Sequence, residues 1–191
     1  MSDRVVFVLP GRGYGVEGPV LYYPAMTAVR RRAELRPHTW SRLYGPVDDP
    51  VDFVSSEIGR AIGEMAAAGI RPLIIAKSLG VAAAPIAARL GLPAIWLTPV
   101  LTAPSAVEGI HAGTAPALLV GGTADRSWDG EVARGLSPYV CEIPGADHSL
   151  LVDGPIGRSL DAMSTLVSAV EAFLDEIGWT AARKSGALSS Q

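Results

Sequence analysis

The most constraining feature of the sequence is a short apolar run that ends in a tight, serine-bearing turn. Residues 73–75 read Leu-Ile-Ile, and they are followed by Ala76-Lys77-Ser78-Leu79-Gly80. An apolar run of this kind is typical of a strand that is buried on both faces of a parallel sheet. The next stretch, Val81–Leu90, is rich in alanine and ends before Gly91, which predicts a packed helix. The residues therefore predict a strand, a sharp turn and a helix in direct succession.

The turn has the pattern small-x-Ser-x-Gly. A tight strand-to-helix turn leaves little space two residues before and two residues after the serine, and Ala76 and Gly80 meet that demand. The same turn raises the Ser78 hydroxyl above the sheet edge, where the N–H groups that begin the next helix converge. In the alternative interpretation, Ser78 simply caps a helix in an ordinary turn. The pattern resembles the nucleophile elbow of the α/β-hydrolase superfamily, which usually has glycine in place of Ala76.

The first expected strand, Val5–Leu9, ends in a glycine-rich loop, Pro10-Gly11-Arg12-Gly13-Tyr14-Gly15. A dinucleotide-binding loop is a poor fit, because the G-x-G-x-x-G spacing and a later acidic residue are both missing. The resemblance implies that this loop supplies one N–H group to an oxyanion hole. The donor would be the N–H of Arg12, with Gly13 as the alternative, and Leu79 would supply the second N–H.

Strands and helices alternate along the whole chain, which predicts an α/β fold. We expect a single domain over residues 1–180, with about six parallel strands and helices on both faces, and a disordered tail over residues 181–191. By resemblance this is the α/β-hydrolase core without its first two strands. The expected strands are Val5–Leu9, Thr39–Leu43, Leu73–Ile75, Pro93–Pro99, Ala117–Gly121 and Tyr139–Ile143, and the expected helices are Glu17–Ala33, Val51–Ala68, Val81–Leu90, Ser105–Ile110, Glu131–Leu136 and Ile156–Ile177, the last with Leu160 on its buried face.

The connection between the fourth and fifth strands is short. Residues 100–116 leave room for one helix of two to three turns. In the superfamily that this chain resembles, a lid or cap domain is usually inserted there. We therefore expect no cap domain and an open, shallow site that is walled mainly by loops.

Three histidines are candidates for the general base that an activated serine requires. His148 follows the last expected strand, in the sequence Gly-Ala-Asp-His-Ser, and so lies at the same sheet edge as Ser78. His38 precedes the second expected strand, and His111 precedes the fifth. The context of His148 also resembles the histidine loop of the α/β hydrolases, which favours it as the base.

A carboxylate must orient the base and stabilise its protonated form. Asp125 follows the fifth expected strand in Gly-Gly-Thr-Ala-Asp, the place of the superfamily's acid. Asp129 is the alternative, and Asp147 is expected to face away from its neighbour His148. The order Ser78, Asp125, His148 is also that of the α/β hydrolases.

These residues predict a serine hydrolase that cleaves a small ester or thioester through an acyl-enzyme on Ser78. The chain resembles the compact, lid-less, dienelactone-hydrolase-like branch, but those enzymes usually carry a cysteine nucleophile, so their substrate is not implied. Arg12 and Lys77 flank the site in sequence and hint at an anionic substrate group, unless Lys77 points behind the elbow. Two alternatives remain open: a non-catalytic binding or regulatory protein on this scaffold, and an acyltransferase that uses the same residues.

The expected partner, as the site residues and the resemblance imply, is a small-molecule acyl substrate, and composition argues against nucleic acid and membrane partners. The formal net charge of −3 does not favour nucleic acid, and the run Arg30-Arg31-Arg32 is expected to face solvent at a helix end. Cys141 is the only cysteine, so we expect neither a disulfide nor a cysteine-based metal cluster, and we expect no cofactor. We find no signal peptide and no apolar run long enough to span a membrane, which favours a cytoplasmic location. The residues leave the oligomeric state open.

Overall fold

A six-stranded parallel sheet forms the centre of the molecule. The computed structural model describes residues 4–41 and 48–180. The strands lie in the order β2-β1-β3-β4-β5-β6, and every neighbouring pair is parallel. The prediction of a single α/β domain with about six parallel strands is therefore confirmed. The strands are β1 Val5–Leu9, β2 Glu34–Pro37, β3 Leu73–Lys77, β4 Ala94–Leu97, β5 Ala117–Gly122 and β6 Tyr139–Ile143.

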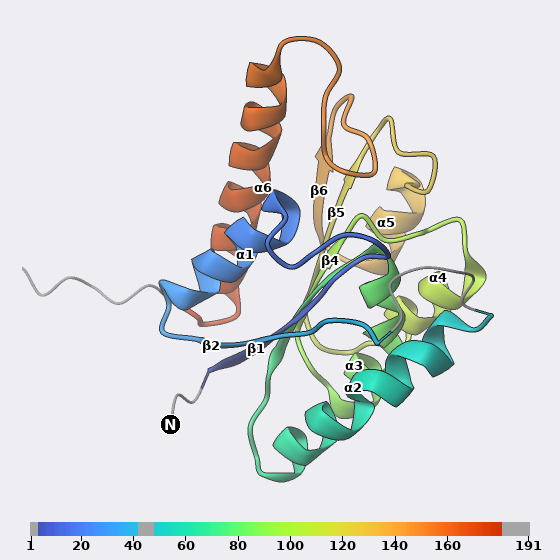
Figure 1. The fold of residues 1–191 in the computed structure, drawn as a ribbon, viewed down its shortest axis with the longest axis vertical. Helices are drawn as coiled ribbons and strands as arrows, with labels where there is room; N and C mark the ends of the chain where they lie inside the picture. Colours follow the sequence, from blue (N-terminus) through green and yellow to red (C-terminus); the bar gives the residue numbers. More distant parts are fainter. Residues whose placement is uncertain (1–3, 42–47, 181–191) are drawn as a thin grey trace, which may run out of the picture.

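Helices cover both faces of the sheet, as Figure 1 shows. Helices α1 (Pro19–Val29) and α6 (Ile156–Glu176) pack against each other on one face. The connection between β4 and β5 holds a single short helix, as predicted, so no cap domain interrupts it. The opposite face carries α2 (Pro50–Ala67), the 3-10 helix η1 (Ser78–Ala83), α3 (Ala84–Leu90), α4 (Pro104–His111) and α5 (Gly130–Leu136).

Each face of the sheet has its own hydrophobic core, because successive side chains of a strand point to opposite faces. In β3, Leu73 and Ile75 belong to the core under α1 and α6, whereas Ile74 and Ala76 belong to the core under the other helices. By this alternation, Lys77 lies on the α1 and α6 side. All five residues of β3 are buried, which explains the uninterrupted apolar run in the sequence.

The chain changes direction across the sheet between β1 and β3. It passes from β1 outward to β2 at one edge, returns to β3 on the other side of β1, and then continues outward to β6. In an open parallel sheet, loops that leave two such strands on opposite faces enclose a crevice where ligands bind. The glycine-rich loop after β1 and the turn after β3 meet at this position.

The second strand lies closer to the N-terminus than predicted. We expected it at Thr39–Leu43, but β2 is Glu34–Pro37; residues 42–43 lie outside the described residues. β2 is an edge strand, so its half-exposed polar residues carry no apolar signal, and a proline at its end costs no ladder hydrogen bond. Trp40, which lies inside the predicted strand, is buried instead, and its indole N–H donates to the Pro10 carbonyl at 3.0 Å.

The helix after the serine-bearing turn begins in two stages, although one helix over Val81–Leu90 was predicted. The chain first forms η1 and then α3, which ends at Gly91 in the left-handed conformation. Pro85 lies in the first turn of α3. A proline lacks the N–H that a continuing helix needs but is tolerated in a first turn, so Pro85 starts a new helix.

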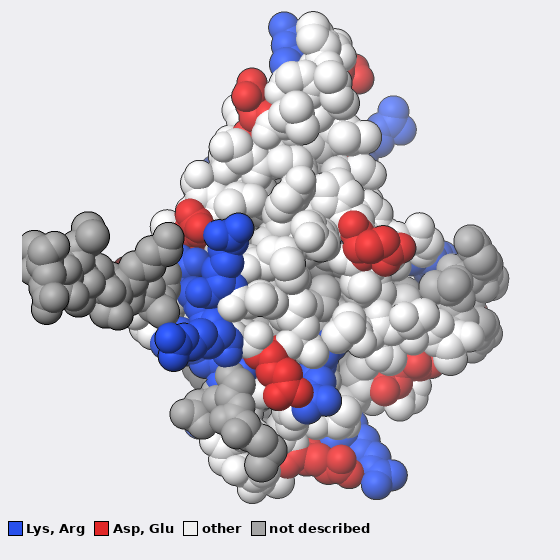
Figure 2. Space-filling view, turned by 60° about the vertical axis from the view of Figure 1, so that its left-hand side comes forward, with Lys and Arg blue, Asp and Glu red and all other residues white. Residues whose placement is uncertain are grey.

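Leu160 was predicted on the buried face of α6, and this is wrong. Its side chain is 63% exposed, and nearby Ile156 is 71% exposed. The buried residues of this part of the helix are Ser159 and Ala162, so Leu160 lies beside the buried stripe and faces solvent. Figure 2, in which the α1 and α6 side comes forward, shows that much of this surface carries no charged side chain.

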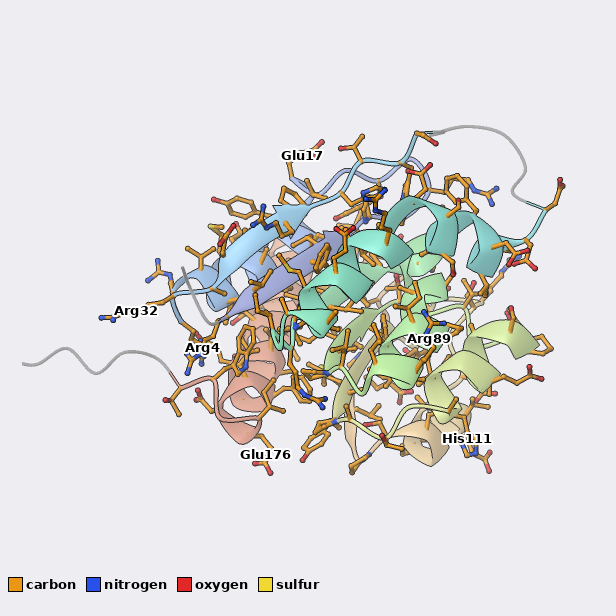
Figure 3. The ribbon with its side chains drawn as sticks, turned by 90° about the horizontal axis from the view of Figure 1, so that it is seen from below. Arg4, Glu17, Arg32, Arg89, His111 and Glu176 are labelled. Carbon is orange, nitrogen blue, oxygen red and sulfur yellow. The ribbon has the colours of Figure 1, made fainter. Side chains whose placement is uncertain are left out.

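We expected the arginine run at the end of α1 to face solvent, but one of its three residues is buried. Arg32 points away from the molecule (Figure 3), but Arg31 is buried. The Arg31 guanidinium pairs with Asp175 of α6 at 2.9 Å and also lies 4.0 Å from Glu171. Arg31 therefore ties α1 to α6, which is why its side chain turns inward.

Two further expectations concern the membrane and the C-terminus. No helix among residues 4–41 and 48–180 combines the length and the apolar character needed to cross a membrane. Residues 181–191, predicted to form a disordered tail, lie outside the described residues.

Candidate active site

Ser78 lies directly after β3 in a backbone conformation that residues with a side chain rarely adopt. Its φ is 49°, in the left-handed region, which costs a non-glycine residue about 1–2 kcal/mol. The turn is packed tightly against Leu9 of β1: a Cβ on Gly80 would come within 2.6 Å of the Leu9 carbonyl oxygen. Ala76, which is fully buried, pairs with Leu9 across the sheet. This packing explains the small residues on both sides of Ser78 and holds the serine at the sheet edge.

His148 lies in the loop that follows β6, and its ring faces Ser78. The imidazole Nε2 is 3.0 Å from the Ser78 hydroxyl oxygen. The loop is shaped by Asp147, whose carboxylate accepts the backbone N–H groups of Ser149 at 2.7 Å and Leu151 at 2.9 Å. Asp147 therefore folds the loop, while its neighbour presents the imidazole to the serine.

Asp125 follows β5 and contacts the other side of the imidazole. Its Oδ2 lies 2.7 Å from His148 Nδ1, and its Oδ1 accepts the N–H of Ser127 at 2.8 Å. The Asp125 side chain is only 2% exposed, so the contact is shielded from water. Asp129, the alternative acid, caps α5 by accepting two backbone N–H groups of that helix. Of the three aspartates considered, Asp125 is thus the one that the structure brings to His148.

The other two histidines lie elsewhere in the molecule. His38 follows β2, where its Nε2 lies 3.3 Å from Glu57 and burial lowers the pKa of the imidazole despite that carboxylate. His111 ends α4 and points outward at the edge of the molecule in Figure 3. The structure therefore places His148, and neither of the others, beside Ser78.

The two residues whose N–H groups the resemblance assigned to an oxyanion hole are Leu79, which follows Ser78 in η1, and Arg12, which lies in the loop after β1. Leu79 is the second residue of η1, so no carbonyl within that helix accepts its N–H. Arg12 belongs to the loop after β1, in which a Cβ on Gly11 would lie 3.3 Å from the Ser78 Cβ. Arg12, Ser78 and Leu79 line one cavity, whereas Gly13, with a φ of 64°, is not among the described residues that line it.

An apolar cavity of about 230 Å³ opens beside Ser78. Its walls come from α2, η1, α4 and the segment before α4, and Arg12 is the one charged residue among its described lining. A second cavity of about 290 Å³ lies at the opposite edge of the sheet, where β4, β5 and β6 begin, and holds none of the predicted site residues. Besides Arg12, Ser78 and Leu79, the first cavity is lined by Pro50, Val51, Val81, Ala82, Val100, Ala103, Ser105 and Ala106.

The Lys77 side chain does not face this cavity. The sequence hinted that Arg12 and Lys77 together attract an anionic substrate group, unless Lys77 points behind the elbow. The residue is 2% exposed and lies on the α1 and α6 side of the sheet, opposite the helices that line the cavity. Its ammonium donates to the His148 carbonyl at 2.9 Å and to the Thr98 hydroxyl at 3.1 Å. It also lies 4.8 Å from the centre of the Tyr14 ring. Lys77 therefore points behind the elbow.

Burial changes the acid strength of this ammonium. Desolvation lowers the pKa of Lys77 from 10.5 to about 8, against the opposing charges of Asp125 and Asp147. The sequence alone did not identify this arrangement, because the partners of Lys77 come from three different loops. A signal was nevertheless present, since a lysine ends an otherwise apolar strand and the chain has only one other lysine, Lys184.

Cys141 is a half-buried residue of β6, and burial raises the pKa of its thiol. It packs against the core under α1 and α6. Within residues 4–41 and 48–180, no group of three or more His, Cys, Asp and Glu side chains is arranged to hold a metal ion.

Comparison with known proteins identifies the fold. No protein-family model and no curated protein matches the sequence. The structure is similar to a lid-less α/β serine hydrolase from Xanthomonas campestris, with a TM-score of 0.66 and 16% identity over 93% of this chain and 83% of that one. It is also similar to Est1E from Butyrivibrio proteoclasticus, with a TM-score of 0.70 and 14% identity over 91% of this chain and 87% of that one.

A third similar structure comes from an animal. The α/β hydrolase domain-containing protein 10 from mouse matches with a TM-score of 0.61 and 12% identity, over 91% of this chain and 90% of that one. At these identities the likeness concerns the fold alone. The chain has the α/β-hydrolase fold, as its resemblance to that superfamily predicted.

Proposed function

We propose that the protein is a serine hydrolase that cleaves a small ester or thioester through an acyl-enzyme on Ser78. The observation that carries the proposal is the unbroken chain of contacts from Asp125 through His148 to Ser78. A serine hydroxyl is a weak nucleophile at neutral pH and needs an adjacent base, which must itself be oriented by a third group. The three side chains have the geometry for these roles.

In the first half of the proposed reaction, the Ser78 oxygen attacks the acyl carbonyl as His148 Nε2 accepts the hydroxyl proton. Asp125 holds the imidazole with its proton on Nδ1 and stabilises the imidazolium that forms. The N–H groups of Arg12 and Leu79 donate to the oxyanion of the tetrahedral intermediate. His148 then gives its proton to the departing alcohol or thiol, which leaves the acyl group on Ser78.

In the second half, water replaces the alcohol or thiol. His148 accepts a proton from the water molecule as its oxygen attacks the acyl carbon, and the same two N–H groups bind the second oxyanion. The intermediate collapses when the bond to the Ser78 oxygen breaks and His148 returns its proton to that oxygen. A carboxylic acid leaves, and the enzyme is restored.

The cavity beside Ser78 supports a small and largely apolar acyl group. Alanine, valine and proline side chains form most of its wall, and its volume of about 230 Å³ suits a short chain. Binding such a group removes apolar surface from water, which favours the complex by roughly 25 cal/mol per Å². The short β4–β5 connection carries no cap domain, and we expect the leaving group to lie on the side of Ser78 away from this cavity.

The proposal is tested by ester and thioester hydrolysis with wild-type protein and Ser78→Ala. We expect turnover of p-nitrophenyl acetate or butyrate, or of a matching thioester, with a loss of at least about 10³-fold in the variant. Equal rates for both proteins would contradict the proposal, and no turnover by folded wild-type protein would favour a binding protein. Product analysis with an added alcohol separates hydrolysis from acyl transfer.

A further inference from the structure

We infer that Lys77 is a positioning residue for the base: its side chain holds the His148 loop against the serine-bearing turn. The inference rests on the proposed function, because it gives Lys77 the role of keeping the His148 imidazole close to the Ser78 hydroxyl. Lys77 precedes Ser78 directly in the chain, and its ammonium donates to the His148 carbonyl at 2.9 Å. One side chain therefore links the turn that carries the nucleophile to the backbone of the base.

The surroundings of the ammonium explain how it holds this position. An ammonium has three donors, and two of them have partners at hydrogen-bond distance, the His148 carbonyl and the Thr98 hydroxyl. The Tyr14 ring lies 4.8 Å from the nitrogen and adds a cation–π contact. The Tyr14 hydroxyl in turn accepts the N–H of Val20 at 3.1 Å, which anchors the ring to α1.

Three residues near Lys77 have strained backbone conformations. Ser78, Thr98 and Leu150 have positive φ values of 49°, 43° and 56°, although none of them is glycine. Such conformations persist where the surrounding contacts enforce them, and they cluster at functional sites. Lys77 directly precedes Ser78, and its ammonium donates to the Thr98 hydroxyl. It also donates to the carbonyl of His148, which lies two residues before Leu150.

Filling space does not by itself account for a charge at this place. Burying an ammonium is costly, and a buried charge is ordinarily paired with an opposite one. Among residues 4–41 and 48–180, no carboxylate oxygen lies within 4.0 Å of the Lys77 nitrogen, whose direct partners are a carbonyl, a hydroxyl and an aromatic ring. A methionine of similar length would fill the same space without the cost. We therefore assign the charge to the bond that it makes with the His148 carbonyl.

The position of Lys77 also predicts which kinetic constant it affects. The side chain lies on the opposite side of the sheet from the apolar cavity, so it does not contact an acyl group bound there. Loosening the His148 loop misplaces the imidazole relative to the Ser78 hydroxyl. An error of about 1 Å in such an arrangement can cost on the order of 100-fold in rate. We therefore expect kcat to change and KM to stay nearly constant.

The charge of Lys77 makes this positioning depend on pH. Burial lowers the pKa of the ammonium to about 8, while Asp125 and Asp147 favour the charged form. The other titratable groups that face it are the Tyr14 ring and His148 itself. Above pH of about 8 the nitrogen becomes a neutral amine, its bond to the carbonyl weakens, and the rate should fall.

The experiment compares wild type with Lys77→Met and Lys77→Arg. We measure the rate at which a fluorophosphonate modifies Ser78, and kcat and KM for p-nitrophenyl butyrate, between pH 6 and 10. We expect Lys77→Met to lower kcat at least about tenfold, to leave KM within about threefold and to lose the alkaline fall, and Lys77→Arg to recover part of the rate. Thr98→Val, which removes one acceptor but keeps the bond to His148, serves as the control with a smaller loss. An unchanged kcat in Lys77→Met would overturn the inference.

A second measurement keeps the inference falsifiable if Lys77→Met does not fold. The chain contains only Lys77 and Lys184, so selective ¹³C labelling of lysine gives two side-chain signals, with Lys184 as the reference. The midpoint at which the Lys77 signal titrates must match the alkaline fall of the labelling rate in wild type. A mismatch, or a constant rate over this range, would overturn the inference. Labelling of wild type at Ser78 would still support the proposed function, so the two failures are distinguishable.

Discussion

The imidazole Nε2 of His148 lies 3.0 Å from the Ser78 hydroxyl, although 70 residues separate the two in the chain. The serine follows β3 and the histidine follows β6, and β4 and β5 lie between these strands in the sheet. The loop after β6 must therefore reach back across the edge of the sheet. Asp125, which follows β5, meets the imidazole on the way.

The contact between Asp125 and His148 predicts the effect of Asp125→Asn. The amide keeps the shape of the side chain but favours the wrong tautomer of the imidazole, so we expect kcat to fall by up to about 10⁴-fold. Asp129→Asn is the matched control, because Asp129 caps α5 and asparagine is an equally good cap. Steady-state kinetics with one ester measures both. An Asp125→Asn variant within about threefold of wild type would show that Asp125 is not the acid.

The apolar cavity predicts a change in acyl-chain preference for Ala106→Trp. An indole at this position fills the cavity beside Ser78, so kcat/KM for a hexanoate ester should fall at least about tenfold relative to an acetate ester. Ala112→Trp is the control, since Ala112 is exposed at the end of the same helix and does not line the cavity. If Ala106→Trp lowers both esters equally, the acyl group binds elsewhere.

The packing of the serine-bearing turn predicts a loss of stability for Gly80→Ala. The added Cβ would lie 2.6 Å from the Leu9 carbonyl oxygen, so the turn must shift away from β1. We expect a loss of roughly 2 kcal/mol or more in the free energy of unfolding, together with a loss of activity. Gly63→Ala in α2, where the added Cβ meets nothing within 4 Å beyond the adjacent residues and turns of its own helix, should instead be neutral or stabilising by up to about 1 kcal/mol. Urea unfolding measures the stability of both variants. Equal effects of the two substitutions would contradict the close packing of Gly80 against the Leu9 carbonyl.

The buried ammonium predicts how the stability of wild type relative to Lys77→Met varies with pH. The pKa of Lys77 is about 8 in the folded protein and about 10.5 when unfolded, so the unfolded chain binds more protons between these values. The stability contributed by this group therefore rises with pH over that window. Between pH 7 and pH 10, the free energy of unfolding of wild type should rise by roughly 2–3 kcal/mol relative to that of Lys77→Met. Urea unfolding at the two pH values measures this difference. A constant difference would mean that the nitrogen is not desolvated.

The sequence predicted buried strands better than it predicted the half-exposed edge strand β2. The strands β1 and β3 were recognisable because both are buried, are largely apolar in sequence and lead into glycine- or serine-bearing turns. Ser78, Asp125 and His148 each follow a strand, and the structure brings the three side chains together; their catalytic roles remain predictions. β2 was misplaced because its residues are polar and half-exposed, so the more apolar stretch around Trp40 gave the stronger strand signal.

Other features depend on contacts that a linear pattern does not contain. The inward turn of Arg31 requires the carboxylate of Asp175, which is 144 residues away. The role of Lys77 likewise depends on Thr98 and His148, which come close only when β3, β4 and the loop after β6 meet at one edge. Side chains whose partners lie on different loops therefore need the folded structure.

The most direct test of the account is intact-mass analysis after treatment with a fluorophosphonate. Such reagents modify a serine that an adjacent base activates, so the mass reports the assembled contact between Ser78 and His148 without knowledge of the substrate. We predict a single adduct on the wild-type protein and none on Ser78→Ala. A folded wild-type protein that stays unmodified, or an adduct that persists in Ser78→Ala, would contradict the central claim that Ser78 is an activated nucleophile.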